Sequence, residues 1–345
     1  NSVDDVDQGN YMAIEDRLRD AMNITLSSDI GTNVFEDVAA RLENMKIEKQ
    51  YMKTGIDAID NLVGGIARKE LGIFAASTGV GKSLMLANIA IKLSKKGLNG
   101  LVVSIELDED VYAIRVDSML TGVPTSFVLE NIDEVKSRYD DIKDDYAPIY
   151  IKRVGMNFNL NDMKTLLNEY KLVHGYYPDF VCLDYIDIMK PVNKNNSSNK
   201  FEEDEGNTHG FRDILVEYNL YGFTASQLNR EADENVVNLS KRHIAGGISK
   251  VNGSDFTLGM VQLEEHVDDN IVELQQIKVR NASKADNKEE IYIDPKTLLI
   301  TNVDDSTNNN DNSSNGEDRD NSTLRNPFSL SKNGKEKLQQ ALGKK

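Results

Sequence analysis

The chain has 345 residues, a formal net charge of −17 and one cysteine, Cys182. This length suits one large α/β domain with appendages or two small domains, and the single cysteine excludes an internal disulfide framework and fits a reducing cytoplasm. No run of about 18 uncharged apolar residues predicts a membrane span, and the acidic balance argues against a general nucleic-acid coat.

Residues 1–50 are predicted to be an acidic linker segment with short amphipathic helices. Residues 1–45 carry a net charge of −7. Apolar residues recur every four positions over residues 12–23 and again over residues 33–46, which predicts two helices. Such helices can pack on the following domain or on that of a neighbour. Because the sequence starts at Asn1 without an apolar leader, we expect it to be a piece of a longer protein.

Residues 51–303 are predicted to form the main domain, because strand-like apolar runs alternate with helical patterns. This alternation predicts an α/β fold with a mostly parallel twisted sheet flanked by helices. The predicted strands are 71–76, 101–105, 149–151, 180–183 and 222–226, and the helices between them are 83–95, 110–120, 160–174 and 209–218. Three later runs, 256–263, 271–280 and 290–293, lack long helices between them and are predicted to be antiparallel additions at the C-terminal side.

Two segments of opposite charge follow the main domain. Residues 304–323 are rich in Asn, Asp and Ser, carry −5, and are predicted to be a disordered linker. Residues 324–345 form a basic tail with a net charge of +5. The spacing of Leu338 and Leu342 in this tail predicts a short helix.

The stretch AASTGVGKS, residues 75–83, indicates a phosphate-binding loop between a strand and a helix, with Ala76 at the first glycine position of G-x-x-x-x-G-K-[ST]. Lys82 is expected to reach the β- and γ-phosphates, and the Ser83 hydroxyl to hold Mg²⁺. The alternative is a turn of small residues that caps a helix. The predicted nucleotide-binding residues are Ser77, Thr78, Gly79, Val80, Gly81, Lys82 and Ser83.

Three polar side chains follow other predicted strands. Asp184 ends a buried apolar run and is expected to hold the water shell of Mg²⁺. Glu106 lies just beyond a strand tip, where a carboxylate can orient and activate the attacking water. Gln227 ends a further strand, where an amide can sense the γ-phosphate. The alternatives are a turn cap for Asp184 and ordinary surface positions for Glu106 and Gln227.

Lys278 and Arg280 alternate along a later strand and so lie on one face of it. Such a pair is often a solvated strand face. In a ring of subunits, the two cations would instead point at the γ-phosphate bound by a neighbour, as an arginine finger does.

The order of these motifs resembles the ATPase domain of DnaB-like replicative helicases, particularly their bacteriophage branch. The matching stretches lie between about residues 53 and 293. "SQLNR", followed about fifty residues later by K-x-R-N, is more specific than the phosphate loop, and alanine at the first glycine position also occurs in this family. The resemblance implies a RecA-like P-loop NTPase fold and a homo-hexameric ring with ATP and Mg²⁺ bound between subunits.

Carried over by motif, the resemblance assigns roles within one subunit. Lys82 and Ser83 bind phosphate and Mg²⁺, Glu106 is the catalytic base, Asp184 is the Mg²⁺-associated acid, and Gln227 is the sensor.

The resemblance assigns Lys278 and Arg280 to the ATP site of the adjacent subunit, which requires a ring built from heterologous contacts. Arg115 also matches a family position, without an assigned role. We expect the family's N-terminal helical domain to be absent from this sequence, with only its linker-like helices, residues 12–46, remaining.

The loop after "SQLNR" lines the central channel in this family and contacts the DNA backbone. No aromatic platform occurs here, so we expect contacts with phosphates rather than base stacking. Residues 190–200 form a second candidate loop, and the alternative for both is an ordinary solvated loop. The predicted DNA-binding residues are Lys241, Arg242, Gly246, Gly247 and Lys250.

The preferred interpretation is an ATP-dependent replicative helicase motor that moves on single-stranded DNA as a ring and unwinds duplex, with 5′–3′ polarity implied by the family. One alternative is a RecA- or KaiC-like ATPase that forms filaments or rings without unwinding, and another is an ATP-binding scaffold without turnover. A primase, a helicase loader or a polymerase is expected to bind through the termini, since a tethered basic tail gains effective concentration near a partner or DNA. The expected location is the cytoplasm, that of a bacterial host if the protein is phage-encoded, without membrane attachment.

Overall fold

The computed structural model describes residues 34–35, 37–39, 42–43, 51–192, 200–229, 238–244, 248–280 and 287–303. The chain divides into two compact units, residues 1–48 and 49–345. In the first unit, the described residues Val38, Ala39, Leu42 and Glu43 are helical, within the predicted helix 33–46. The predicted helix 12–23, the linker 304–323 and the basic tail 324–345 lie outside the described residues.

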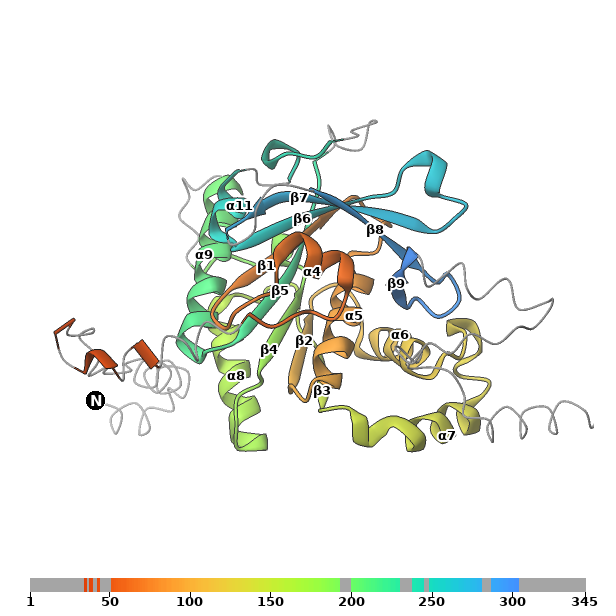
Figure 1. The fold of residues 1–345 in the computed structure, drawn as a ribbon. Coiled ribbons are helices and arrows are strands. Elements are labelled where there is room, and N and C mark those ends of the chain that lie inside the picture. The colour runs from red at the N-terminus through yellow and green to blue at the C-terminus, as the bar shows by residue number, and fades with distance from the viewer. Residues whose placement is uncertain are drawn as a thin grey trace, which may run out of the picture. The chain divides into compact units, whose positions relative to one another are not determined.

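The second unit is built on a single sheet. Nine strands of the described residues lie in the order β3-β2-β4-β5-β1-β6-β7-β8-β9 (Figure 1). Their bounds are β1 Leu71–Ala76, β2 Gly100–Ser104, β3 Ile149–Arg153, β4 Phe180–Asp184, β5 Tyr221–Gln227, β6 Phe256–Val261, β7 Ile271–Val279, β8 Lys288–Ile293 and β9 Ile300–Asn302. The first six strands pair in parallel, and β7, β8 and β9 pair antiparallel. The predicted α/β fold, a mostly parallel sheet with antiparallel additions, is confirmed.

One prediction about the sheet is wrong. The sequence pattern places β6 among the antiparallel additions, but this strand pairs parallel to β1, with Gly72 opposite Phe256 and Ala76 opposite Met260. The connection between β5 and β6 contains the short helix α11, Ile248–Gly253, which packs against α9. A crossover of this length returns the chain to the amino end of the sheet, and a parallel strand results.

Helices connect the parallel strands. The α-helices of the second unit, within the described residues, are α4 Asp57–Val63, α5 Lys82–Lys95, α6 Glu109–Thr121, α7 Ile132–Ile142, α8 Leu160–His174, α9 Lys200–Tyr218 and α11 Ile248–Gly253. Short 3₁₀ segments are η1 Thr125–Phe127, η2 Lys143–Asp145, η3 Ile186–Ile188, η4 Lys241–His243 and η5 Glu264–His266. None of the described helices is long and apolar enough to cross a membrane.

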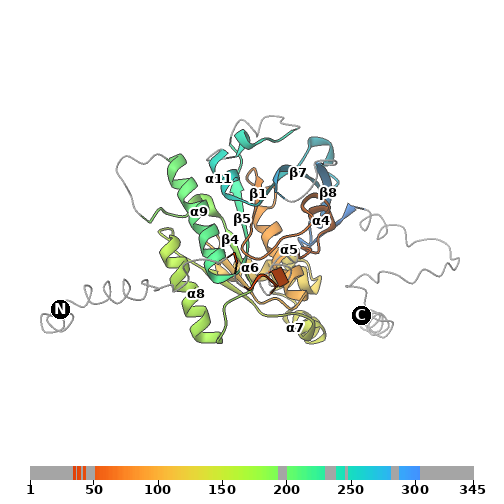
Figure 2. The ribbon, with the colours of Figure 1, turned by 60° about the vertical axis from the view of Figure 1, so that its left-hand side comes forward.

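The two faces of the sheet carry separate apolar cores because strand side chains alternate between faces. Phe74 and Ala76 of β1 pack in a core with α4, α5 and α6. Leu71 and Ile73 of the same strand pack on the other face with α8 and α9. Figures 1 and 2 show these two groups of helices on opposite sides of the sheet.

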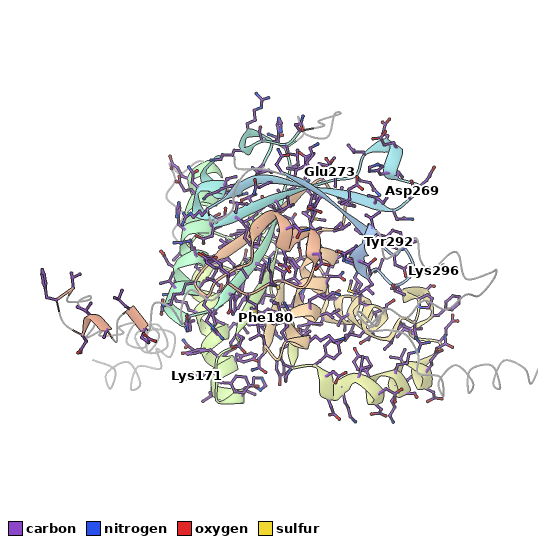
Figure 3. All side chains as sticks on the ribbon, viewed as in Figure 1. Lys171, Phe180, Asp269, Glu273, Tyr292 and Lys296 are labelled. Atoms are coloured by element: carbon purple, nitrogen blue, oxygen red, sulfur yellow. The ribbon has the colours of Figure 1, made fainter. Side chains whose placement is uncertain are left out.

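Local sequence signals fix several details of this arrangement. Asn159 caps α8 by accepting hydrogen bonds from Asn161 and Asp162, whose side chain returns the bond in a capping box. Gly100 of β2 is required by close packing, because a Cβ atom there would lie 2.1 Å from the ring of Phe180, a residue labelled near the centre of Figure 3. These contacts hold β2 and β4 side by side, which positions the polar residues at their carboxyl ends.

Candidate active site

The phosphate-binding loop leaves β1 at Ala76 and enters α5 at Lys82. Gly79 (φ 90°) and Gly81 (φ 107°) have left-handed backbone conformations that favour glycine. Ala76 is not among the residues with positive φ, and it is buried as the last residue of a strand. Alanine therefore replaces the first glycine without backbone strain.

Lys82 lies folded over the loop. Its Nζ donates to the carbonyl oxygens of Ala76 and Ser77, each at 2.9 Å. Both acceptors belong to the loop itself, so the ammonium is held at the loop and its charge faces the carboxyl edge of the sheet. That charge also opposes the rise in the pKa of Asp184 that burial causes. Lys82 is thus positioned to contact a phosphate cradled by the loop.

Asp184 ends β4 beside the start of α5. Burial raises the pKa of its carboxyl to about 6, while the Ser83 hydroxyl, Arg115 and Lys82 act in the opposite direction. Ser83 is close enough to favour the ionised carboxylate, but neither buried carboxylate oxygen has a hydrogen-bond partner of good geometry among the described residues. An unsatisfied buried carboxylate beside a serine hydroxyl fits the protein ligands that Mg²⁺ takes in phosphate-bound sites.

Glu106 lies at the same edge. Ser104 of β2 is opposite Asp184 of β4, and the Ile105 N–H donates to the Asp184 carbonyl at 2.9 Å. Glu106 is the next residue; its side chain is exposed, and its charge raises the pKa values of Asp184 and Tyr185. The two predicted acids therefore come together from adjacent strands, one buried and one open to solvent.

Gln227 joins this group from β5. It is opposite Ala76 in the parallel pair of β1 and β5, and its Nε2 donates to Thr78 Oγ1 in the phosphate loop at 3.0 Å. An amide in this position touches the loop directly. The structure thus brings the predicted sensor, the loop, Asp184 and Glu106 to one edge of the sheet.

Sequence reasoning missed two residues that support this edge. Tyr112 of α6 is buried and donates its hydroxyl to the Ser83 carbonyl at 3.2 Å. Asp187 of η3 accepts the backbone N–H of Gln227 at 2.7 Å and the hydroxyl of Ser226 at 3.0 Å. The stretch "DYID" holds both Asp184 and Asp187, but its sequence alone does not show which acid faces the loop and which braces β5.

Lys278 lies at the opposite edge of the sheet. On β7 it is opposite Thr257 of β6, and its Nζ donates to the carbonyl oxygens of Val251 at 2.6 Å, Asn252 at 2.9 Å and Ser254 at 2.5 Å. All three hydrogens of the ammonium are thereby engaged. Burial and the nearby Arg280 lower its pKa to about 8.

Arg280 follows β7 and is held by Asp255, which sequence reasoning also missed. The buried Asp255 carboxylate accepts from Arg280 Nη1 at 2.8 Å, from Arg212 Nε at 3.0 Å and from the Leu71 N–H at 2.9 Å. The side chain of Arg280 is 44% exposed, against 29% for Arg212. Asp255 therefore holds the guanidinium of Arg280 through Nη1, and the side chain remains partly exposed.

The two groups of predicted residues are separated by the length of β1. Asp255 contacts Leu71 at the amino end of the strand, and the phosphate loop begins after Ala76 at its carboxyl end. At about 3.3 Å per residue this separation is roughly 17 Å for Arg280. Lys278 is opposite Thr257, which is opposite Ile73, so it lies roughly 10 Å from the loop along the strands and two strands away from β1. Lys278 and Arg280 are too distant to contact a phosphate on their own subunit's loop.

The predicted DNA-binding residues fall into three groups. Lys241 and Arg242 lie exposed on η4. Gly246 and Gly247, like residues 193–199 of the second candidate loop, lie outside the described residues. The prediction for Lys250 is wrong, because its side chain is 1% exposed and its ammonium is paired with Asp187 at 2.8 Å and Asp204 at 3.0 Å.

Comparisons with known proteins identify the family of this chain. The family model described as the DnaB-like helicase C terminal domain matches residues 52–243, more than half of the chain. A DnaB-like replicative helicase of Enterobacteria phage T4 is 26% identical over 285 residues, covering 79% of this chain and 59% of that protein. The chain thus spans about three fifths of that relative's length.

Two solved structures share the fold. One is described as the structure of a DnaB-like replicative helicase and its interactions with primase; it has a TM-score of 0.70 and 13% identity, and the match covers 86% of this chain and 73% of that chain. The other is described as an ATPase domain; it has a TM-score of 0.66 and 14% identity, and the match covers 79% of this chain and 99% of that chain.

Proposed function

Since the chain belongs to the family of the DnaB-like helicase C terminal domain, we propose that it is the motor of an ATP-dependent replicative DNA helicase. In this proposal, six copies form a ring, move along single-stranded DNA and unwind duplex. The relative from phage T4 is itself described as a DnaB-like replicative helicase, which supports the assignment.

One observation carries the proposal: the site residues occupy two opposite edges of the same sheet. The loop, Asp184 and Gln227 lie at the carboxyl edge. Arg280 is held by Asp255 at the amino edge, and Lys278 lies two residues before it on β7. A subunit therefore offers a phosphate cradle on one edge and cations on the other. Head-to-tail contacts in a closed ring bring these two edges of neighbouring subunits together.

The cradle binds ATP through backbone and side-chain donors. The loop N–H groups and the N-terminus of α5 face the β-phosphate, and Lys82 turns from its loop carbonyls to the β- and γ-phosphates. Ser83 and Asp184 would hold Mg²⁺, Asp184 in its ionised form. When bound, the metal supplies positive charge to the phosphate oxygens.

Hydrolysis then uses groups from two subunits. Glu106 is exposed at the same edge as Asp184, so it orients a water and accepts its proton as general base. Gln227 reads the γ-phosphate beside Thr78. Arg280 of the adjacent subunit stabilises charge that develops on the transferred phosphoryl group, and Lys278 does so once its ammonium turns from its three carbonyl acceptors.

We further propose that Lys241 and Arg242, with Gly246 and Gly247, contact DNA phosphates in the ring's channel. Movement is 5′–3′, as the family resemblance implies. The solved helicase described with its interactions with primase supports a primase as a partner of this chain, and we propose a loader or polymerase as further partners. We place the activity in the cytoplasm of a bacterial host.

The test is ATP hydrolysis and fork unwinding by the full-length protein, with and without single-stranded DNA. We expect DNA to stimulate hydrolysis and forked duplex to be unwound only with ATP. Hydrolysis that is indifferent to single-stranded DNA contradicts the proposal. Electron microscopy adds a second criterion, because closed rings support the helicase motor and helical filaments on DNA support a RecA-like ATPase instead.

A further inference from the structure

A buried cluster of three charged side chains, which the proposed mechanism does not use, lies between the phosphate-loop edge of the sheet and the edge that carries Arg280. Lys250 of α11 is 1% exposed, and its ammonium contacts Asp187 of η3 at 2.8 Å and Asp204 of α9 at 3.0 Å. A lysine this deeply buried is rare, and removing one partner of such a pair is strongly destabilising. The three side chains therefore hold α11 in one position relative to β5 and α9.

One side of this cluster ends at the proposed sensor. Asp187 Oδ2 accepts the Gln227 N–H at 2.7 Å, and its Oδ1 accepts both the Ser226 hydroxyl at 3.0 Å and the Lys250 ammonium. The side chain of Gln227 continues to Thr78 in the phosphate loop. Asp187 thus connects Gln227, which contacts the phosphate loop, to Lys250 through charge-assisted hydrogen bonds.

The other side of the cluster ends at the proposed trans cation. The residues that follow Lys250 in the chain, Val251, Asn252 and Ser254, supply the three carbonyl oxygens that hold Lys278. A shift of α11 cannot leave these carbonyls in place. Lys278 would therefore move with α11 or lose its acceptors.

We propose that Asp187, Lys250 and α11 form a buried connection that positions Gln227 and Lys278 together. Nucleotide contact at Gln227 is then transmitted through Asp187 and Lys250 to α11, and so to the cation that this subunit offers its neighbour. The residues in this connection are positioning residues. The inference rests on the proposed function, since it takes Gln227 as the sensor and Lys278 as the trans cation.

The test compares Asp187→Asn with Asp204→Asn in the full-length protein. Both carboxylates contact the same ammonium, but only Asp187 also binds Gln227, and an amide cannot accept at both of its positions. Hydrogen–deuterium exchange of the peptide covering residues 248–255 is measured with ADP and with a non-hydrolysable ATP analogue. We expect exchange with the analogue to be slower than exchange with ADP by roughly fivefold or more, in the parent and in Asp204→Asn. Fivefold is the lower end of the usual range of coupling between two sites.

In Asp187→Asn the difference between the two nucleotides should disappear. A purely structural role would raise exchange equally with both nucleotides and keep the difference. Gln227→Ala, which removes no buried charge, provides the second variant if Asp187→Asn does not fold, and it should also abolish the difference.

Three outcomes overturn the inference: a parent without any nucleotide-dependent change in this peptide, a change that persists in Asp187→Asn, and a change that persists in Gln227→Ala. Both are read against a parent that binds the analogue and hydrolyses ATP in response to single-stranded DNA. A parent that fails those assays contradicts the proposed function instead.

Discussion

The carboxyl of Asp184 is expected to destabilise the fold that carries it. Burial raises its pKa from 3.8 to about 6, so its folded-state pKa lies above its unfolded value. Below pH 3.8 the Asp184 carboxyl is neutral in both the folded and the unfolded state and costs the folded state nothing. As the pH rises from 3.8 through about 6, the free energy of unfolding falls, because the buried carboxyl resists ionisation. At pH 7.5 the ionised carboxylate costs the folded state about 3 kcal/mol.

At pH 5.0 the same cost is only about 1.6 kcal/mol, because the folded carboxyl is then largely protonated. Asp184→Asn removes the ionisation and adds a cost for the buried amide that does not depend on pH. The free energy of unfolding of Asp184→Asn, relative to the parent, should therefore rise by about 1.4 kcal/mol between pH 5.0 and pH 7.5.

The assay is urea denaturation at both pH values, in EDTA and without nucleotide. Asp141→Asn, a neutralised but exposed carboxylate on α7, is the control and should give the same difference at both pH values. If the relative stability of Asp184→Asn is equal at pH 5.0 and pH 7.5, the burial argument for this residue is refuted.

Four further predictions concern the composite site and the DNA contacts. The turnover number should decline as the pH rises through about 8, where Lys278 loses its proton, and Lys278→Arg should remove this decline in a pH–rate profile. Gln227→Ala should lower turnover about 10- to 100-fold through the lost contact with the γ-phosphate, measured as steady-state hydrolysis with DNA present. Asp255→Asn removes the carboxylate that holds Arg280 and should lower turnover about tenfold. The KM for ATP should be unchanged, since the phosphate loop lies at the other edge of the sheet. A raised KM with normal turnover would count against this prediction. Replacing Lys241 and Arg242 together by alanine should reduce the salt dependence of single-stranded DNA affinity by a slope of about 1.4, measured by fluorescence anisotropy at several salt concentrations.

The fold was largely predictable because its signals are local. The alternation of apolar runs and helical patterns predicts the parallel strands and the helices between them, and the predicted bounds of α8 are those observed, Leu160–His174. The direction of β6 was not predictable in this way. It depends on where the chain re-enters the sheet, and the intervening α11 is too short to give a periodic signal.

The candidate site shows the same division. Lys82 and Ser83 follow β1, and Asp184 and Gln227 are the last residues of β4 and β5, so their gathering at one edge follows from the parallel sheet.

The sequence pattern misleads at Lys250, because a lysine near glycines in a polar loop is usually solvated. Its two carboxylate partners come from α9 and η3, at sequence separations that no local pattern reveals. Asp255 escapes prediction for the same reason, since its role depends on Arg212 and Arg280 meeting it in space.

The central claim is that each ATP site is shared between two subunits, and mixed rings test it most directly. Lys82→Ala removes the phosphate contact of one subunit, and Arg280→Ala removes the cation offered to its neighbour, so each variant alone should be inactive. Mixed rings contain interfaces where an intact loop meets an intact Arg280. We predict that mixing the two inactive variants restores part of the DNA-stimulated ATP hydrolysis. If rings shown to contain both variants are as inactive as rings of either variant alone, the shared site is contradicted.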